Sequence, residues 1–158
     1  MRKLFTLFLV ALSVTESFGQ TTLVEWNFPN NPDDAVADWG IAANVAQIIN
    51  AVGGTSAVSF SNAGAATNSA SATNWDAGSG VKYWMVEVNT AGYNSITLSS
   101  KQRSTGTAPR DFMLEYRIGA AGAWTAIPGG NIIAATDFTT GVVNNLPLPA
   151  ACDDQPSV

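Results

Sequence analysis

The stretch VKYWMVEVN, residues 81–89, decides the fold class, because its side chains alternate, with Trp84 and Val86 on one predicted face. Apolar side chains at every second position are typical of a β-strand that has one face on the core. The same alternation follows in SITLSSKQR, residues 95–103, and in DFMLEYRI, residues 111–118. Turns that contain glycine or proline separate the three stretches. The centre of the chain therefore predicts consecutive antiparallel strands.

Weaker signals of the same kind lie before this centre. Residues 22–28 alternate and predict a strand, and residues 57–61 predict another short one. Residues 41–50 fit a helical face, but we expect extended structure there because their neighbours all indicate strands. Residues 62–80 are small and polar and predict a long loop.

After the centre, residues 119–122 predict a hairpin loop that is followed by a returning strand at residues 123–127. The Pro-Gly-Gly sequence at residues 128–130 predicts the end of that strand. Short strands at regular spacing, separated by glycine-rich turns, are typical of sandwiches and barrels. We therefore expect an all-β, two-layer antiparallel β-sandwich, jelly-roll-like, from about residue 22 onward.

Residues 1–19 have the pattern of a secretory signal peptide. Two basic residues precede an apolar stretch at residues 4–12, and small residues occupy the −3 and −1 positions before Gln20. The apolar stretch is shorter than the ~20 residues that a membrane-spanning helix needs. We expect residues 20–158 to form one β-sandwich domain that is secreted, extracellular or at the cell surface, without a membrane anchor after cleavage.

Composition excludes several classes of function. The chain has 7 basic and 12 acidic residues, a net charge of −5, whereas nucleic-acid binding needs a basic face. It has no histidine, which excludes Ser-His-Asp and Cys-His catalytic arrangements within these residues. Its one cysteine, Cys152, excludes an internal disulfide. We expect no nucleic-acid partner and no catalysis by this segment.

Two stretches resemble a known kind of domain: EWNFPNNPDDAVADWGIAANV at residues 25–45 and LSSKQRSTGTAPRDFMLEYRIG at residues 98–119. They are similar to the N-terminal β-sandwich, jelly-roll-like, domain of large secreted multidomain bacterial proteins. In such proteins the domain precedes nucleases, lamin-tail-like domains or sorting segments, and the resemblance implies no catalytic residues. In similar domains a further apolar strand and a closing strand follow the segment that corresponds to LPAAC, residues 148–152. The resemblance therefore implies a sandwich that lacks its last strands here.

Aromatic side chains in or beside predicted loops are the candidate ligand-binding residues. An aromatic face can stack on a sugar ring, and nearby amides and carboxylates can take its hydroxyl groups. The alternative is that these rings close the ends of the core. The candidates are Trp39, Trp75, Tyr93 and Trp124.

Three aspartates in one predicted loop, Asp33, Asp34 and Asp38, form a candidate calcium site. Calcium takes oxygen ligands, which such a loop can supply. The spacing is not that of an EF-hand loop, and an acidic loop that is simply solvated is the alternative. We expect no other cofactor.

Glu25, Glu87 and Glu115 lie on outward faces of predicted strands, and paired carboxylates are the catalytic groups of glycosidases. The favoured interpretation is a ladder of opposite charges with Lys101 and Arg103 across neighbouring strands, which stabilises a sheet.

The expected function is a non-catalytic accessory or adhesion module of an exported bacterial protein, with a polysaccharide or a cell-surface protein as its partner. One alternative is the non-catalytic front part of a secreted hydrolase, such as a nuclease, whose active site lies beyond Val158. Another is a structural spacer in a surface protein. Fold alone does not decide among them.

Overall fold

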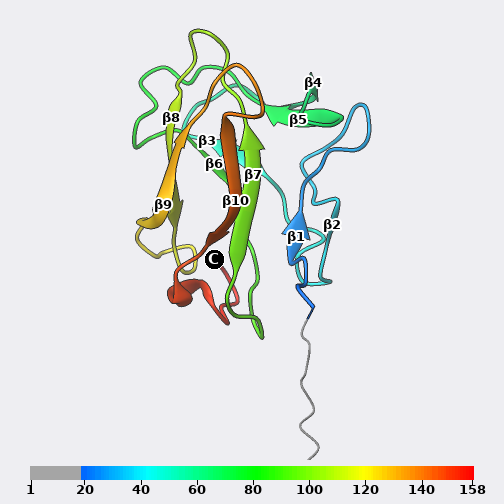
Figure 1. Ribbon diagram of the computed structural model, residues 1–158, viewed down its shortest axis with the longest axis vertical. Coiled ribbons are helices and arrows are strands. Elements are labelled where there is room, and N and C mark those ends of the chain that lie inside the picture. Colours follow the sequence, from blue (N-terminus) through cyan, green and yellow to red (C-terminus); the bar gives the residue numbers. More distant parts are fainter. Residues whose placement is uncertain (1–18) are drawn as a thin grey trace, which may run out of the picture.

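The computed structural model describes residues 19–158 (Figure 1). These residues form ten β-strands and one short 3₁₀ helix, η1, so the all-β prediction is confirmed. The predicted signal peptide falls almost entirely outside the described residues. The elements in chain order are β1 Val24–Glu25, β2 Trp39–Gly40, β3 Asn50–Val52, β4 Ser59–Ala63, β5 Asn68–Ser71, β6 Tyr83–Met85, β7 Thr97–Gln102, β8 Asp111–Tyr116, β9 Thr125–Ile133, β10 Gly141–Pro147 and η1 Ala150–Cys152.

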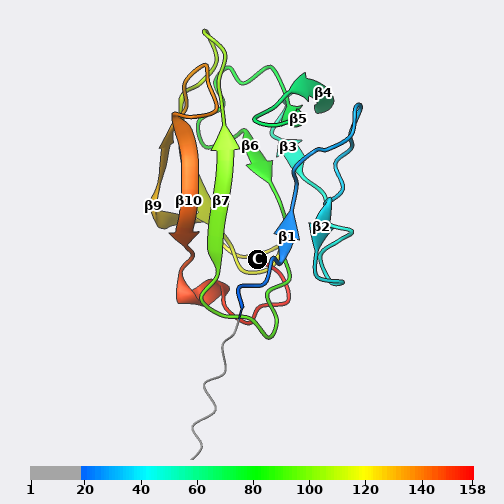
Figure 2. The same cartoon turned by 45° about the vertical axis from the view of Figure 1, so that its right-hand side comes forward.

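The described strands pair in five antiparallel ribbons: β1 with β2, β3 with β6, β4 with β5, β7 with β10, and β8 with β9. Strands β9 and β10 also pack side by side, so β8, β9, β10 and β7 make one layer of the sandwich. Strands β3 and β6 lie behind this layer (Figure 2). The β1–β2 ribbon stands at the side of the sandwich, and β4–β5 covers one end (Figures 1 and 2).

Strands β7 and β8 show the predicted alternation. Along β7, Leu98 and Ser100 turn inward between exposed neighbours, and along β8 the inward positions are Phe112, Leu114 and Tyr116. This is the period of two that a half-buried strand imposes on its sequence. The strand predicted at residues 81–89 does not show it: it is shortened to β6, whose three side chains are all half-buried, and Val86, predicted to face inward, is 37% exposed.

The Pro-Gly-Gly sequence at residues 128–130 does not end a strand, so that prediction was wrong. Strand β9 continues through it, and the pairing register with β8 shifts between Met113 and Glu115. The partners of these two residues are Asn131 and Ala126, which leaves the intervening residues in a bulge. A bulge releases its residues from the ladder, so proline's missing N–H is tolerated there.

Three predictions about the first half of the chain also need correction. Residues 62–80 are not one long loop, because β5 lies within them and pairs with β4. Residues 41–50 begin with a turn, in which Asn44 N donates to Ile41 O at 2.8 Å, and become extended in β3. The strand predicted at residues 22–28 is shortened to Val24–Glu25.

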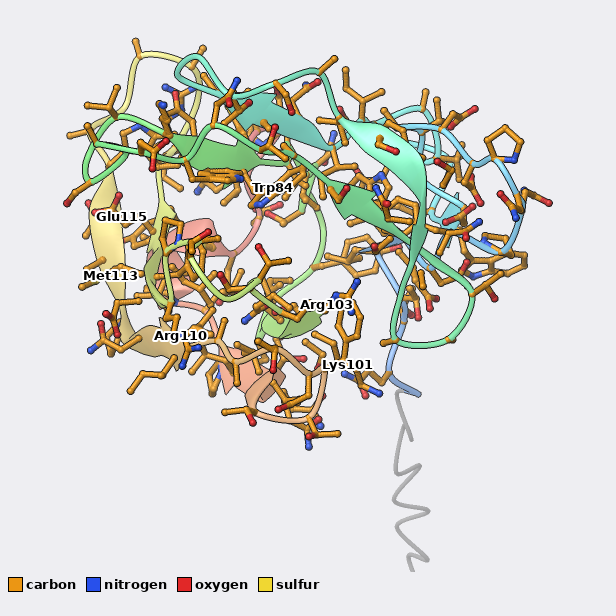
Figure 3. The ribbon with its side chains drawn as sticks, turned by 90° about the horizontal axis from the view of Figure 1, so that it is seen from above. Trp84, Lys101, Arg103, Arg110, Met113 and Glu115 are labelled. Carbon is orange, nitrogen blue, oxygen red and sulfur yellow. The ribbon has the colours of Figure 1, made fainter. Side chains whose placement is uncertain are left out.

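The predicted charge ladder is also wrong, because its strands are not neighbours. Glu87 follows β6, which pairs with β3, whereas β7 pairs with β10. Seen from above, Glu115 and Lys101 lie in different parts of the molecule (Figure 3). The Glu87 carboxylate instead accepts a hydrogen bond from the Ser157 hydroxyl at 2.8 Å.

The buried apolar side chains lie in and after β9. They are Ile127, Ile132, Ala134 and Cys152. Polar side chains are buried as well, and they bond backbone groups: Asn44 bonds Leu23 and Asn89, and Thr90 bonds Cys152 and Gln155. Buried polar groups need such partners to offset the loss of water.

Candidate functional site

Trp39 is the most prominent of the candidate aromatic residues, because 67% of its surface is exposed. It stands in β2, where its Cα partner on β1 is Glu25. Residues directly opposite each other in an antiparallel ribbon point to the same face, and both of these are exposed. The indole and the carboxylate therefore share one solvent-facing surface.

An open depression of about 520 Å³ lies beside this surface. Its lining comes from β1, β2, the residues just before β1 and the loop between the two strands, and polar side chains predominate. The residues are Thr22, Glu25, Asn27, Pro29, Asn30, Asp38 and Trp39.

Gly40 holds β2 close against β1. Its Cα partner is Val24, and a Cβ atom at position 40 would lie 2.5 Å from the Leu23 carbonyl oxygen. The backbone φ of Gly40 is 154°, an angle that residues with a side chain rarely adopt. Glycine is therefore required directly after Trp39 for the ribbon to form.

Asp38 shapes the rim of the depression through the backbone. Its Oδ2 accepts hydrogen bonds from the amides of Asn27 at 2.8 Å and Phe28 at 2.9 Å. Phe28 has a φ of 49°, a conformation that costs free energy for a bulky residue. The two charge-assisted bonds help to offset that cost and set the course of the chain away from β1.

The other two aspartates of the predicted calcium site also bond backbone amides. Asp33 accepts from Asn30 N at 2.7 Å and from Asp34 N at 2.8 Å, and Asp34 accepts from Val36 N at 2.7 Å. Within residues 19–158 no three acidic, cysteine or histidine side chains gather to hold a metal ion. The three aspartates therefore bond the backbone of their own loop, and the calcium site stays a prediction.

Trp75 is half-buried and packs inward. Its Nε1 donates to the Ala72 carbonyl at 2.8 Å, and its ring centroid lies 5.7 Å from that of Trp84. Trp84 extends from β6 toward the space between the layers (Figure 3). A second depression of about 190 Å³ includes Trp75 together with Thr105 and Pro109. The contacts of Trp75 fit the alternative in which the ring closes the core.

Trp124 is 39% exposed and packs edge-on against Tyr83, with centroids 5.5 Å apart. The Arg117 guanidinium lies 4.6 Å from the centroid of the Trp124 ring, within cation–π range. Tyr93 is half-buried in the loop between β6 and β7. Neither depression contains two of the four candidate aromatic residues, so the structure does not bring them together.

The sequence missed most of the lining of the Trp39 depression. Glu25, Asn27 and Asn30 join Trp39 only because β1 and β2 pair. Alternation did place Glu25 opposite the apolar face of its strand. Nothing in the spacing showed that residue 39 would be its partner.

The chain matches no protein-family model, no curated protein and no solved structure. Among residues 19–158, no helix is both long and apolar enough to cross a membrane. The function is therefore argued from the Trp39 depression itself.

Proposed function

We propose that this chain is a non-catalytic carbohydrate-binding module of an exported protein, and that Trp39 is its sugar-stacking residue. The observation that carries the proposal is the 67% exposure of Trp39 at the rim of a depression lined by hydroxyl, amide and carboxylate side chains.

The argument rests on the chemistry of a sugar ring. One face of a pyranose presents C–H groups, which pack on an aromatic face, while its hydroxyl groups need hydrogen-bond partners. The depression supplies these partners in Thr22, Asn27 and Asn30. Asn side chains donate and accept, which suits hydroxyl groups of either orientation.

Other features fit the same proposal. A surface depression beside one exposed indole suits a chain of sugars, which is bound in open grooves, better than a drug-sized ligand, which is enclosed. The signal-like residues 1–19 support export.

The test compares Trp39→Ala with Ile133→Ala in the full chain. Ile133 on β9 is an equally exposed large apolar residue, at 67%, and provides the matched control. Binding is measured by co-sedimentation with insoluble cellulose, chitin and chitosan and by calorimetry with soluble oligosaccharides. Because stacking on an aromatic side chain contributes about 1–3 kcal/mol, we expect Trp39→Ala to weaken binding about 5- to 150-fold.

Ile133→Ala should bind as the unaltered chain does, and both variants should melt within a few degrees of it. Unchanged binding by Trp39→Ala would contradict the proposal. Failure of the unaltered chain to bind any of the polysaccharides would do so as well.

A further inference from the structure

The Trp39 depression is negatively charged, and this charge should affect the binding of neutral, acidic and cationic sugars differently. Its seven lining residues include the carboxylates of Glu25 and Asp38 and no lysine or arginine. The whole chain carries a net charge of −5. Uronic-acid and sulfated sugars would therefore meet repulsion at this surface, whereas a cation would be attracted.

Glu25 is placed to act together with the indole. It is the Cα partner of Trp39 in the β1–β2 ribbon, and both side chains are exposed on the same face. Cβ atoms of such partners lie ~4.5–5.5 Å apart. A group that stacks on the indole therefore lies within reach of the Glu25 carboxylate.

Asp38 contributes negative charge to the depression rather than a direct contact with a ligand. Its Oδ2 already accepts two backbone hydrogen bonds, from Asn27 and Phe28. Rotating this carboxylate toward a ligand would break both bonds. Glu25, on an exposed strand position, is the carboxylate that can turn to meet a bound cation.

We propose that the depression prefers a cationic amino sugar, such as the glucosamine unit of a deacetylated polysaccharide, over neutral and acidic sugars. The ring stacks on Trp39, and the ammonium group pairs with Glu25. This inference rests on the proposed carbohydrate-binding function and deepens it. Cation–π attraction to tryptophan and charge pairing with the carboxylate act in the same direction.

The experiment uses three hexasaccharide probes on the full chain: glucosamine, N-acetylglucosamine and galacturonic acid. Acetylation keeps the sugar ring and removes the charge. Calorimetry at low salt and about pH 6, where most amines keep their proton, gives the ratio of the dissociation constants. We expect glucosamine to bind about three- to tenfold more tightly than N-acetylglucosamine, since both effects are small at a surface.

Three variants test which residues cause the preference for glucosamine. Glu25→Gln should shrink the preference for glucosamine, because it weakens binding of glucosamine more than binding of N-acetylglucosamine. Glu115→Gln, which makes the same charge change at an exposed position on β8, should keep the preference. Trp39→Ala should weaken binding of both sugars. The preference should also shrink as salt is added, because an exposed charge pair is screened.

The outcomes separate the two proposals. Equal binding of the two sugars, tighter binding of galacturonic acid, or a preference that Glu25→Gln leaves undiminished overturns the amino-sugar inference and leaves the carbohydrate-binding function in place. Unchanged binding by Trp39→Ala overturns the function and the inference together. Binding of none of the three probes overturns the amino-sugar inference.

Discussion

Asn44 and Asn89 are joined by a pair of hydrogen bonds that imitates a step of a β-ladder. Asn44 Nδ2 donates to the Asn89 carbonyl at 3.0 Å, and the Asn89 amide donates to Asn44 Oδ1 at 2.8 Å. Asn44 Nδ2 also donates to the Leu23 carbonyl at 3.1 Å. One fully buried side chain therefore ties the segment that enters β1 to the segment that leaves β6.

Removing this amide should destabilise the whole domain. In Asn44→Ala, the amide and the carbonyl of Asn89 lose their partner at a fully buried position, while the Leu23 carbonyl keeps its bond from the Ile41 amide. Buried unsatisfied groups are costly. We expect the free energy of unfolding in urea to fall by about 2–4 kcal/mol. The exposed Asn94→Ala is the control and should change it by less than about 0.5 kcal/mol. Equal stability of the two variants would show that the Asn44 bonds contribute little.

Gly40→Ala should disturb the ribbon that carries Trp39. The new Cβ would meet the Leu23 carbonyl and the Val24 Cα, and the backbone conformation is one that alanine rarely adopts. We expect a loss of about 1–3 kcal/mol of stability, together with weaker sugar binding. Gly106→Ala, where no atom lies within 4 Å of the new Cβ, is the matched control. If both variants melt and bind alike, the close approach of β2 to β1 is not required.

The turn after β9 should make stability depend on pH in acid. Hydrogen bonds from the Thr139 side chain, and then from the Thr140 and Thr139 backbone, hold the pKa of Asp137 at about 2, below its ordinary value of 3.8. A carboxyl whose pKa is lowered on folding stabilises the protein above its ordinary pKa, and this contribution is lost as the pH falls through the folded pKa.

Asp137→Asn should therefore melt at a lower temperature than the unaltered chain at pH 6, and the difference should narrow between about pH 4 and pH 2. Melting curves followed by circular dichroism over this range measure the effect. Asp76→Asn makes the same charge change in another exposed loop and serves as the control. A difference that stays constant with pH would contradict the assignment.

Cys152 should be unreactive in the folded protein. The residue is fully buried, and burial, followed by the nearby charge of Asp153, raises the pKa of its thiol. The thiolate is the reactive form, so both effects slow alkylation. Iodoacetamide at pH 8, followed by mass spectrometry, should leave the native chain unmodified and label it fully in denaturant. Rapid labelling of the native chain would show that the segment around η1 opens readily.

The fold was predictable from the sequence where apolar and polar residues alternate strictly. Leu98, Phe112 and Leu114 alternate with exposed residues, so β7 and β8 were evident from the sequence. Strand β5 was not, because its residues, NSAS, are small and polar and carry no apolar alternation. The predicted strand at residues 123–127 was too short, because the Pro-Gly-Gly sequence indicates a break. In the structure β9 continues, and these residues form a bulge in its pairing with β8.

The candidate site was predictable only in part. The indole of Trp39 was identified because it stands in a polar, loop-like segment. Its pairing with Glu25 depends on the register of two very short strands. This register does not follow from the polarity of the individual residues. The same limit applies to Asp38, because its hydrogen bonds from the amides of Asn27 and Phe28 depend on the course of the loop, whereas the sequence offered it only as a candidate calcium ligand.

The position of the β1–β2 ribbon has a consequence for how this protein can change over generations. None of the residues that line the Trp39 depression belongs to the buried set around Ile127, Ile132 and Cys152. Exposed substitutions away from structural features cost little stability. Under the proposed function, replacements at Asn27 or Asn30 should therefore change the ligand preference while the scaffold stays intact. Successive substitutions can therefore change this surface while each variant along the way stays folded.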